Sequence, residues 1–331
     1  MKKVKSLYCL AIIFPLMGLA LTQVGLAPAL SDVIVISAYY LLLAGSWDLL
    51  AGFTGQFSFA HVGLAAAGAY GVGWVTLHLG LPVWVSFIVS PLIVGATGFA
   101  LGLVSCRVRG TQLSLITFAF AGAFGVFLSA ASDITGGSMG LQVPRLIHGR
   151  SHDIYLLVAG VAVGLFFALQ EWMLSGALGL RMQAVRDNEE VAAASGIDVV
   201  KVKVLAFTIT AAVAGFAGAF YASYVGVLAP TILSINEMGL VLAMVVVGGM
   251  GYRLGPLLGV VVIRTTEYFV RGAAAQYTTL VIAAITLLVV LYFRQGLVHA
   301  LTQVWRRIYA PQGRWGEHPV ETVLPPPSAS D

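Results

Sequence analysis

The sequence predicts an all-α membrane protein, a polytopic bundle of about ten helices (eight to ten). Three observations lead to this fold class. First, 59% of the 331 residues are hydrophobic and only 10% are charged, whereas soluble domains contain about 25% charged residues. Second, the apolar runs are long enough to cross a bilayer and lack the strict alternation of barrel strands. Third, the basic residues between the runs fall mainly on one side of the membrane.

Ten candidate spans follow one another along the chain. They are 7–23, 33–51, 57–78, 84–105, 112–131, 154–174, 204–228, 238–251, 256–270 and 278–293. The third contains many small residues, so full crossing stays open there. The eighth and ninth hold only 14 and 15 residues, against about 20 for a straight crossing. The sequence GGMGYRLGP between them indicates a helix hairpin, or two helices that stop short and line a cavity.

The first apolar run permits two interpretations. It resembles a signal peptide, with Ala27-x-Ala29 as a cleavage site. It also fits a first span held in place by Lys2, Lys3 and Lys5. We favour the span, because the rest of the chain is already embedded in the membrane.

Counting basic residues gives the orientation. With a cytoplasmic N-terminus and alternating spans, fourteen Lys and Arg residues fall inside and three outside, Arg145, Arg150 and Arg271. This positive-inside bias predicts that both termini are cytoplasmic. Residues 1–310 then form one transmembrane domain, and the Pro-rich segment 311–331 is predicted to be a disordered tail.

One internal segment, 180–203, concentrates charge. Its sequence LRMQAVRDNEEVAAASGIDVVKVK holds eight of the 32 charged residues (18 Lys and Arg plus 14 Asp and Glu). Asp187 with Glu190 three residues later has the spacing of a capping box, and Gly196 supplies a left-handed end. We therefore expect a cytoplasmic helix over 188–195.

A helix of about two turns is marginal on its own in water. Either the membrane domain or a partner must hold it, and the small side chains Ala192, Ala193 and Ala194 allow another surface to approach closely. The alternative is an ordinary solvated loop. The residues of the segment alone do not decide between these interpretations.

Polar groups inside spans are further candidates. Gly55, Gln56, Ser58 and His61 belong to one segment, GQFSFAH, and could bind a solute or brace neighbouring helices. Asp48, beside Trp47, lies at the inner end of the second span. A capping or interfacial role is favoured there over an ion site.

Two more groups lie toward the outside. Thr135, Gly136 and Gly137 could form a tight turn that exposes N–H groups to a carboxylate; the alternative is a plain loop. Arg264 and Glu267 are three residues apart and share a helix face. We expect them to pair with each other and to reach the outer interface with Arg271.

Several site classes are not expected. His148 and His152 lie in a polar loop with Gly149 and Arg150 between them, so a metal site is not predicted. No GxxxxGK[ST] sequence occurs, which excludes ATP binding through a P-loop. In GGMGYRLG, Leu254 stands where a dinucleotide fingerprint requires glycine.

The remaining composition gives no other class of ligand. The net charge of +4 records topology and does not suggest nucleic acid. Cys9 and Cys106 are expected to be small apolar fillers. No cofactor is predicted in this chain.

Five ordered segments carry a resemblance to a known family. They are GFTGQFSFAHVGLAAAGAY (52–70), RVRGTQLSLITFAF (107–120), TGGSMGL (135–141), AVRDNEEVAAASGIDVVKVKVLAFTITAAVAGFAGAFYA (184–222) and VVVGGMGYRLGPLLG (245–259). Together with FRQGL at 293–297, they resemble the branched-chain amino acid ABC transporter permeases of the Liv type. The similarity covers roughly 35–300, and it is strongest to the longer of the two permease types.

The resemblance implies a role for each group. The charged segment would be the coupling helix that docks on an ATPase subunit; its matching residues are Asp187, Glu189, Glu190, Ala193 and Gly196. The translocation pathway would use the sites Gly55, Gln56, Ser58, His61, Thr117, Gly249 and Gly251. The turn Thr135–Gly136–Gly137 would lie at the outer mouth or at the binding-protein contact.

The implied protein is a non-enzymatic transport subunit in the bacterial inner membrane. Its partners would be cytoplasmic ATP-binding subunits, a second related permease, and a periplasmic or lipid-anchored solute-binding protein. Leucine, isoleucine and valine are the first substrates expected; urea, short amides or other amino acids are alternatives. From the residues alone, an ion-coupled transporter using Asp48 and Arg264–Glu267, or a membrane scaffold, stays open.

Overall fold

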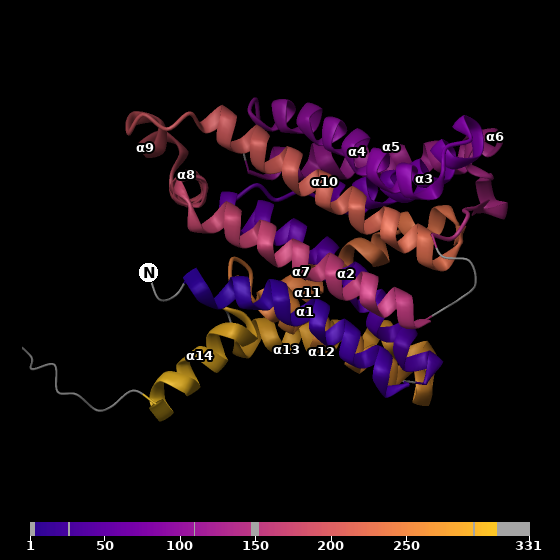
Figure 1. Cartoon of the computed structure of the whole chain (residues 1–331). Helices are drawn as coiled ribbons and strands as arrows, with labels where there is room; N and C mark the ends of the chain where they lie inside the picture. Colours follow the sequence, from indigo (N-terminus) through magenta and orange to yellow (C-terminus); the bar gives the residue numbers. More distant parts are fainter. Residues whose placement is uncertain (1–3, 26, 109, 147–151, 294, 310–331) are drawn as a thin grey trace, which may run out of the picture.

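The computed structural model describes residues 4–25, 27–108, 110–146, 152–293 and 295–309. The predicted tail 311–331 and the residues Arg109, His148, Arg150 and Arg294 lie outside this range. The described chain is a bundle of helices (Figure 1). The helices are α1 (Val4–Val24), α2 (Pro28–Thr54), α3 (Ala60–Leu79), α4 (Val83–Ser105), α5 (Thr111–Ala130), α6 (Ser132–Thr135), α7 (His152–Ser175), α8 (Ala177–Asp187), α9 (Glu189–Ala194), α10 (Val199–Val225), α11 (Ile235–Gly248), α12 (Gly255–Ala274), α13 (Thr278–Tyr292) and α14 (Gly296–Tyr309).

Little of the described chain forms regular structure other than α-helix. Strands β1 (Leu141–Gln142) and β2 (Val227–Leu228) pair antiparallel, with Leu141 opposite Leu228. The short 3-10 turns are η1 (Gly137–Met139), η2 (Pro230–Leu233) and η3 (Ala275–Tyr277). The β1–β2 pair joins the loop after α6 to the end of α10.

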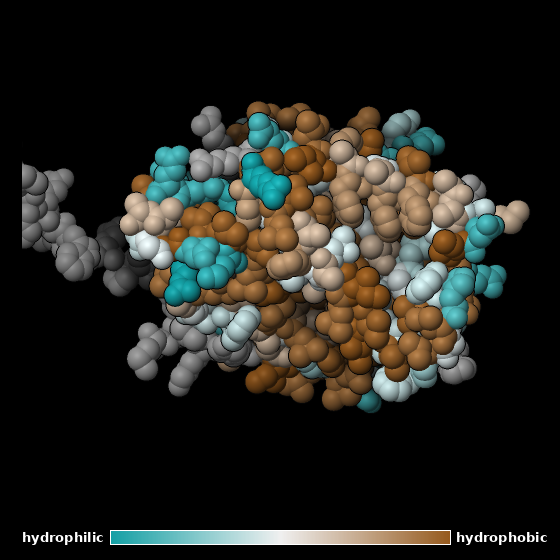
Figure 2. Space-filling model, turned by 90° about the horizontal axis from the view of Figure 1, so that it is seen from above, coloured by the Kyte–Doolittle hydropathy of each residue, from teal (hydrophilic) through white to brown (hydrophobic). Residues whose placement is uncertain are grey.

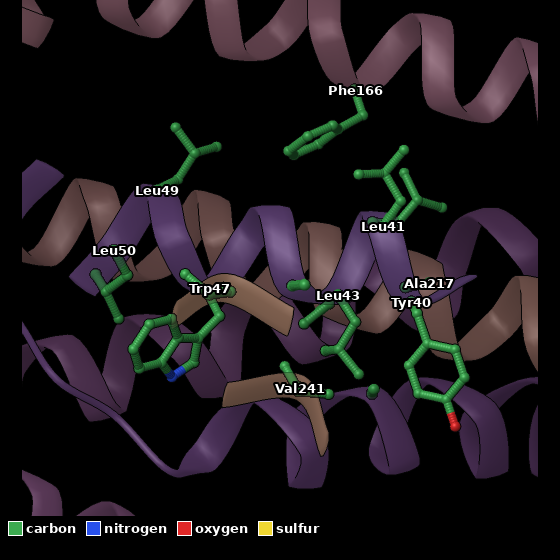
Figure 3. Close-up of a cluster of buried hydrophobic side chains, with 14 of the residues drawn as sticks. Tyr40, Leu41, Leu43, Trp47, Leu49, Leu50, Phe166, Ala217 and Val241 are labelled. Carbon is green, nitrogen blue, oxygen red and sulfur yellow. The ribbon is translucent and has the colours of Figure 1, made fainter. Parts of the chain in front are cut away.

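Helix α2 lies at the centre of the bundle. Every residue from Ala38 to Thr54 is buried, and the helix contacts α7, α8, α10, α11 and α12. Figure 3 shows Phe166 of α7 directed toward α2 from one side, while Trp47 and Tyr40 of α2 point to the opposite side. A helix that is apolar around its whole circumference belongs in the core of such a bundle.

Small residues allow the helices to approach closely. Where α3 crosses α10, a Cβ atom at Gly68 would lie 2.1 Å from the carbonyl oxygen of Gly215. A Cβ atom at Gly218 would lie 1.8 Å from that of Ala65. Helices in lipid gain stability from such backbone contacts, because burial away from water no longer drives their association.

Helix α1 packs along α7 (Figure 1). The rings of Phe14 and Phe167 stack with centroids 5.2 Å apart. A Cβ atom at Gly160 would lie 2.6 Å from the carbonyl oxygen of Phe14. The first apolar run is thus part of the helical bundle.

Seven helices within the described residues are long and apolar enough to cross a membrane. They are α2, α3, α4, α5, α7, α10 and Ala275–Tyr292, which contains α13. The apolar stretches Cys9–Gln23 and Ile235–Gly248 are shorter. The three remaining predicted spans correspond to these two stretches and to α12, which carries Arg264, Glu267 and Arg271. An all-α, multi-pass membrane bundle is therefore the correct class.

Several predicted boundaries differ from the structure; the seventh span is predicted to end at 228, for example, but α10 ends at Val225 because Gly226 is left-handed. The sequence predicts a third span at 57–78, but α3 begins only at Ala60, because Gly55 ends α2 in the left-handed region (φ 73°) and 56–59 is not helical. The ninth span is predicted at 256–270, whereas α12 continues to Ala274 and holds 20 residues. The predicted break before it is present, since α11 ends at Gly248 and α12 begins at Gly255.

The bundle has two distinct ends. Helices α8, α9 and α14 lie at one end in Figure 1, and α6 lies at the other. In Figure 2 the hydrophilic residues gather mostly toward these two ends, with a broad apolar region between them. The charged segment 180–203 and the turn at 135–137 therefore occupy opposite ends.

Candidate functional site

The charged segment contains the predicted short helix, but its cap is different. The sequence predicts Asp187 as the N-cap; the structure corrects this to Asn188. Helix α8 runs through Asp187, so that residue already has helical backbone, whereas Asn188 is extended (φ −162°, ψ 112°). The Asn188 side-chain oxygen accepts the N–H groups of Glu190 (2.9 Å) and Val191 (3.1 Å). An asparagine side chain satisfies these orphan donors as well as an aspartate does.

The end of α9 agrees with the prediction. Gly196 has φ 82°, its N–H donates to the carbonyl of Ala193 (3.0 Å), and the N–H of Ile197 donates to that of Ala192 (3.1 Å). This pair of bonds is a Schellman motif, which requires a left-handed residue. Beyond its chain neighbours, no atom lies within 4 Å of a Cβ placed at Gly196, so its side is open.

The next helix begins immediately. The Asp198 carboxylate caps α10 by accepting the N–H of Lys201 (3.0 Å), and this hydrogen bond lowers the pKa of the carboxyl group. Two caps therefore fix the turn between α9 and α10 from both sides.

The predicted coupling residues face in two directions. Glu189 pairs with the buried ammonium group of Lys203 in α10 at 2.5 Å, and Ala192 is buried. Glu190, Ala193 and Gly196 are exposed. Glu189 therefore attaches α9 to the membrane bundle, while Glu190, Ala193 and Gly196 stay exposed and can be reached by another surface.

Arg186 joins the charged segment to the central helix. Its Nη1 donates to the carbonyl of Gly52 in α2 (2.9 Å), and its Nε and Nη2 donate to Asp187 Oδ1 (3.1 and 3.0 Å). A Cβ at Gly55 would lie 3.2 Å from the Arg186 side chain. Asp187 thus orients this arginine and does not cap α9.

The break between α11 and α12 packs against the same part of α2, beside Asp48 and Gly52. The Gly251 N–H donates to Asp48 Oδ1 at 2.8 Å, and a Cβ at Gly52 would lie 2.6 Å from the Gly251 nitrogen. We call Asp48, Gly52, Gly55, Arg186 and Gly251 the inner junction. Sequence reasoning treats Arg186 only as a topology signal and misses this contact; no spacing in the sequence indicates it.

The break is also tied to two other helices. Arg253 Nη1 contacts Glu171 Oε2 of α7 at 2.5 Å, and Tyr252 Oη lies 2.8 Å from His299 Nδ1 of α14. A Cβ at Gly296 would lie 2.3 Å from Gly249 Cα. Gly249 and Gly251, expected in the pathway, therefore lie at the end that carries the charged segment.

The segment 55–61 is braced by α5, which carries Thr117. Thr117 Oγ1 accepts the N–H of Phe59 (3.0 Å) and donates to the carbonyl of Leu113 (2.9 Å). Ser58 Oγ accepts the N–H of Ala60 (3.1 Å). The structure thus brings Thr117 to this segment.

Gln56 and His61 are buried in the same region. Gln56 Nε2 donates to Thr54 Oγ1 (3.1 Å) and to the carbonyl of Lys203 (3.4 Å). Neither ring nitrogen of His61 has a hydrogen-bond partner among the described residues. The adjacent cavity, between this segment and α11, has a volume of about 10 Å³, which is about the room that one water needs.

The turn at 135–137 has the predicted tight geometry. Gly136 and Gly137 are left-handed (φ 73° and 51°). The Gly136 N–H donates to the carbonyl of Ser132 (2.9 Å), and the Gly137 N–H donates to Thr135 Oγ1 (3.2 Å). These two groups are used within the loop, which argues against our hypothesis that they face an incoming carboxylate.

No cluster of metal-ligating side chains occurs among the described residues. Cys9 and Cys106 are not joined in a disulfide. Burial raises the pKa of the Cys106 thiol, which favours its neutral form.

Comparison with known proteins agrees with this arrangement. Residues 29–291 match the family model for the branched-chain amino acid transport system / permease component. The permease protein LivM of a high-affinity branched-chain amino acid transport system in Escherichia coli K12 is 28% identical over 295 residues, covering 81% of this chain and 69% of LivM.

Two further relatives cover similar lengths. LivH of the same organism, described in the same terms, is 24% identical over 292 residues, covering 80% of this chain and 92% of LivH. The autoinducer 2 import system permease LsrC of Enterobacter sp. strain 638 is 28% identical over 316 residues, covering 91% of this chain and 88% of LsrC. No solved structure matches the chain significantly. A family match over most of the chain, with relatives that are permeases and not enzymes, means that this protein belongs to the branched-chain amino acid transport system permease family.

Proposed function

We propose that the chain is the membrane-spanning permease subunit of an ATP-driven importer for branched-chain, hydrophobic amino acids. It would work by alternating access in the bacterial inner membrane. Two cytoplasmic ATP-binding subunits, a second related permease and a periplasmic or lipid-anchored solute-binding protein would complete the importer. The family and the names of the relatives support this class of cargo.

The proposed topology has ten spans and cytoplasmic termini. The transmembrane domain covers 1–310, and 311–331 is a tail. The spans are α1, α2, α3, α4, α5, α7, α10, α11, α12 and α13, which places α8, α9 and α14 in the cytoplasm. The positive-inside bias and the two polar ends of the bundle support this assignment.

One observation carries the coupling role. Helix α9 is capped at both ends, is attached to α10 through Glu189–Lys203, and presents Glu190, Ala193 and Gly196 outward. A rigid helix with small exposed side chains suits insertion into a cleft on an ATPase subunit. Movement there would reach α2 through the Arg186 contact with Gly52.

The ion-coupled alternative receives less support. Arg264 pairs with Glu267, and Asp48 accepts the Gly251 N–H, so each has a local partner. Uptake that survives ATP depletion but collapses with the proton gradient would favour this alternative over the ATP-driven importer.

The test is co-purification from gently solubilised native membranes. We expect the tagged protein to bring an ATP-binding subunit and a second permease, and Glu190→Lys to lose the ATP-binding subunit. Asp133→Lys makes the same charge reversal in exposed α6 at the other end of the bundle and should retain it. Arg186→Ala should keep the ATPase bound but reduce ATP-driven uptake.

The proposal fails if the protein purifies alone or as a homodimer. Normal uptake by Glu190→Lys would count against α9 as the docking helix, even if the wild-type protein co-purifies with both partners.

A further inference from the structure

A polar cavity lies beside the middle of the central helix. It has a volume of about 200 Å³ and is lined by Tyr39 and Tyr40 of α2, Tyr221 of α10, Glu237 of α11, and residues of the segment 227–232. One water needs only about 10–15 Å³, so this space can hold part of a solute. It is separate from the inner junction and from the segment 55–61.

Glu237 supplies the acidic side chain of this cavity. It accepts a hydrogen bond from Tyr40 Oη at 2.9 Å. The nearby Arg264 and Arg271 form their salt bridges with Glu267, and Arg271 keeps two-thirds of its side chain exposed. Among the described residues, no salt bridge reaches Glu237. A carboxylate within a membrane bundle is costly unless a positive charge accompanies it.

The aromatic rings complete an environment for a cation. Tyr39 and Tyr221 lie with ring centroids 4.7 Å apart, and Tyr39 and Tyr40 with centroids 5.0 Å apart. One face of the Tyr40 ring is already covered by the guanidinium of Arg264, at 5.1 Å from the centroid. Tyrosine rings attract ammonium groups, and the attraction is stronger when water is excluded.

A larger and mainly apolar cavity shares Glu237 as a wall. Its volume is about 970 Å³, and it lies between α11, α12 and α13. Leu240, Ile282 and Leu287 line it, and Arg271 stands at its edge with two-thirds of its side chain exposed. One carboxylate therefore borders both a cavity rich in tyrosine and a chamber suited to an aliphatic group.

We propose that the two cavities form one binding site for a zwitterionic amino acid with an aliphatic side chain. Glu237 and the three tyrosines bind the α-ammonium group, the aliphatic group lies along Leu240 and Ile282, and Arg271 faces the carboxylate. This inference rests on the proposed function and selects among its substrates. An amino acid offers an ammonium donor to Glu237 and a carboxylate to Arg271 at the same time, whereas urea and short amides offer neither charged group.

The experiment uses the importer complex purified with its partner subunits. Cys9 and Cys106 are replaced by serine, and Thr231→Cys places one thiol in the cavity lined by Tyr39, Tyr40 and Tyr221, here called the tyrosine cavity. We expect leucine to slow maleimide labelling of this thiol severalfold. The probe 4-methylpentanoate has the same carbon skeleton without the ammonium group and should not slow it. Glu237→Gln, which keeps an acceptor for Tyr40, should abolish the protection by leucine.

Asp133→Asn is the control, because Asp133 of α6 is an exposed carboxylate that lines neither cavity, and the same Asp/Glu-to-amide change there disturbs no buried pair. It should leave the protection unchanged. Uptake of labelled leucine by the same complex is measured in parallel.

The outcomes separate the site from the function. If the complex transports leucine but leucine does not protect the thiol, the site is wrong and the proposed function stands. Equal protection by 4-methylpentanoate would overturn the role of Glu237. If the complex transports no amino acid, the proposed function fails and this inference fails with it.

Discussion

The pair Glu189–Lys203 shows that the role assigned to Glu189 from the sequence changes once its partner in the structure is known. Both belong to the charged segment, where the family resemblance implies that Glu189 faces an ATPase. In the structure Glu189 is bonded to a lysine that is only 4% exposed. A buried ammonium group needs its counter-charge, so this contact holds α9 against α10.

We predict that Glu189→Gln destabilises the protein by about 1–3 kcal/mol, because Lys203 is left without a charged partner. Thermal unfolding of the purified protein would measure this loss. Lys203→Met combined with Glu189→Gln should recover part of it, since no charge is then buried.

Glu190→Gln is the neighbouring control. Its side chain is exposed, and surface changes of this kind usually stay within about 0.5 kcal/mol. Equal losses for Glu189→Gln and Glu190→Gln would show that the Lys203 contact is not structural.

At the scale of elements, the crossing of α3 and α10 depends on glycine, because glycine has no Cβ atom to hold the two backbones apart. Gly68, Gly215 and Gly218 place two backbones in direct contact. Even one methyl group there must separate the helices along the contact. The crossing also sets where Tyr221 stands, because α10 carries it.

Gly218→Ala should therefore destabilise the bundle by about 1–3 kcal/mol or more, as overpacking does. The midpoint temperature for loss of a monodisperse peak in gel filtration would report it. Gly122→Ala in α5 is the control, because a Cβ added there would meet no neighbouring side chain or helix within 4 Å, and alanine favours a helix by about 1 kcal/mol over glycine. A similar loss at both positions would mean that close packing at the crossing is not the cause.

At the scale of the whole molecule, the two polar ends give a topology that can be measured. Helix α9 and the turn after α6 lie at opposite ends of the bundle (Figure 1). The positive-inside bias assigns α9 to the cytoplasm. Both regions offer exposed positions for a probe.

With Cys9 and Cys106 replaced by serine, we expect Asp133→Cys to react with a membrane-impermeant maleimide in intact cells. Ala193→Cys should react only after the membrane is permeabilised. The opposite pattern would invert the proposed orientation, and reaction of both in intact cells would contradict a spanning bundle.

The sequence predicts what repeats along the chain or is local to it. Helix positions follow from apolar runs, and the left-handed Gly196 follows from its place after a short helix. The predicted N-cap is wrong by one residue because Asp187 and Asn188 are both good caps, and only the continuation of α8 selects between them.

Contacts between distant segments could not be predicted in the same way. The hydrogen bond from Arg186 to Gly52 spans 134 positions, and the one from Tyr40 to Glu237 spans 197. Neither leaves a periodic pattern. By contrast, Thr117 is assigned to the same pathway as the segment 55–61 through family resemblance, which carries information on spatial proximity that a single sequence lacks.

The charged segment contacts the bundle through two side chains, Arg186 and Glu189. The two helices that they contact both line the tyrosine cavity. Arg186 holds α2, which carries Tyr39, and Glu189 holds α10, which carries Tyr221. Gly52 and Tyr39 are separated by roughly 20 Å along α2 at about 1.5 Å per residue. With a lever arm of that length, a tilt of about 5° displaces Tyr39 by roughly 1.7 Å. A small rotation at the end of the bundle that carries α9 is then enough to widen or narrow the tyrosine cavity from a distance of roughly 20 Å.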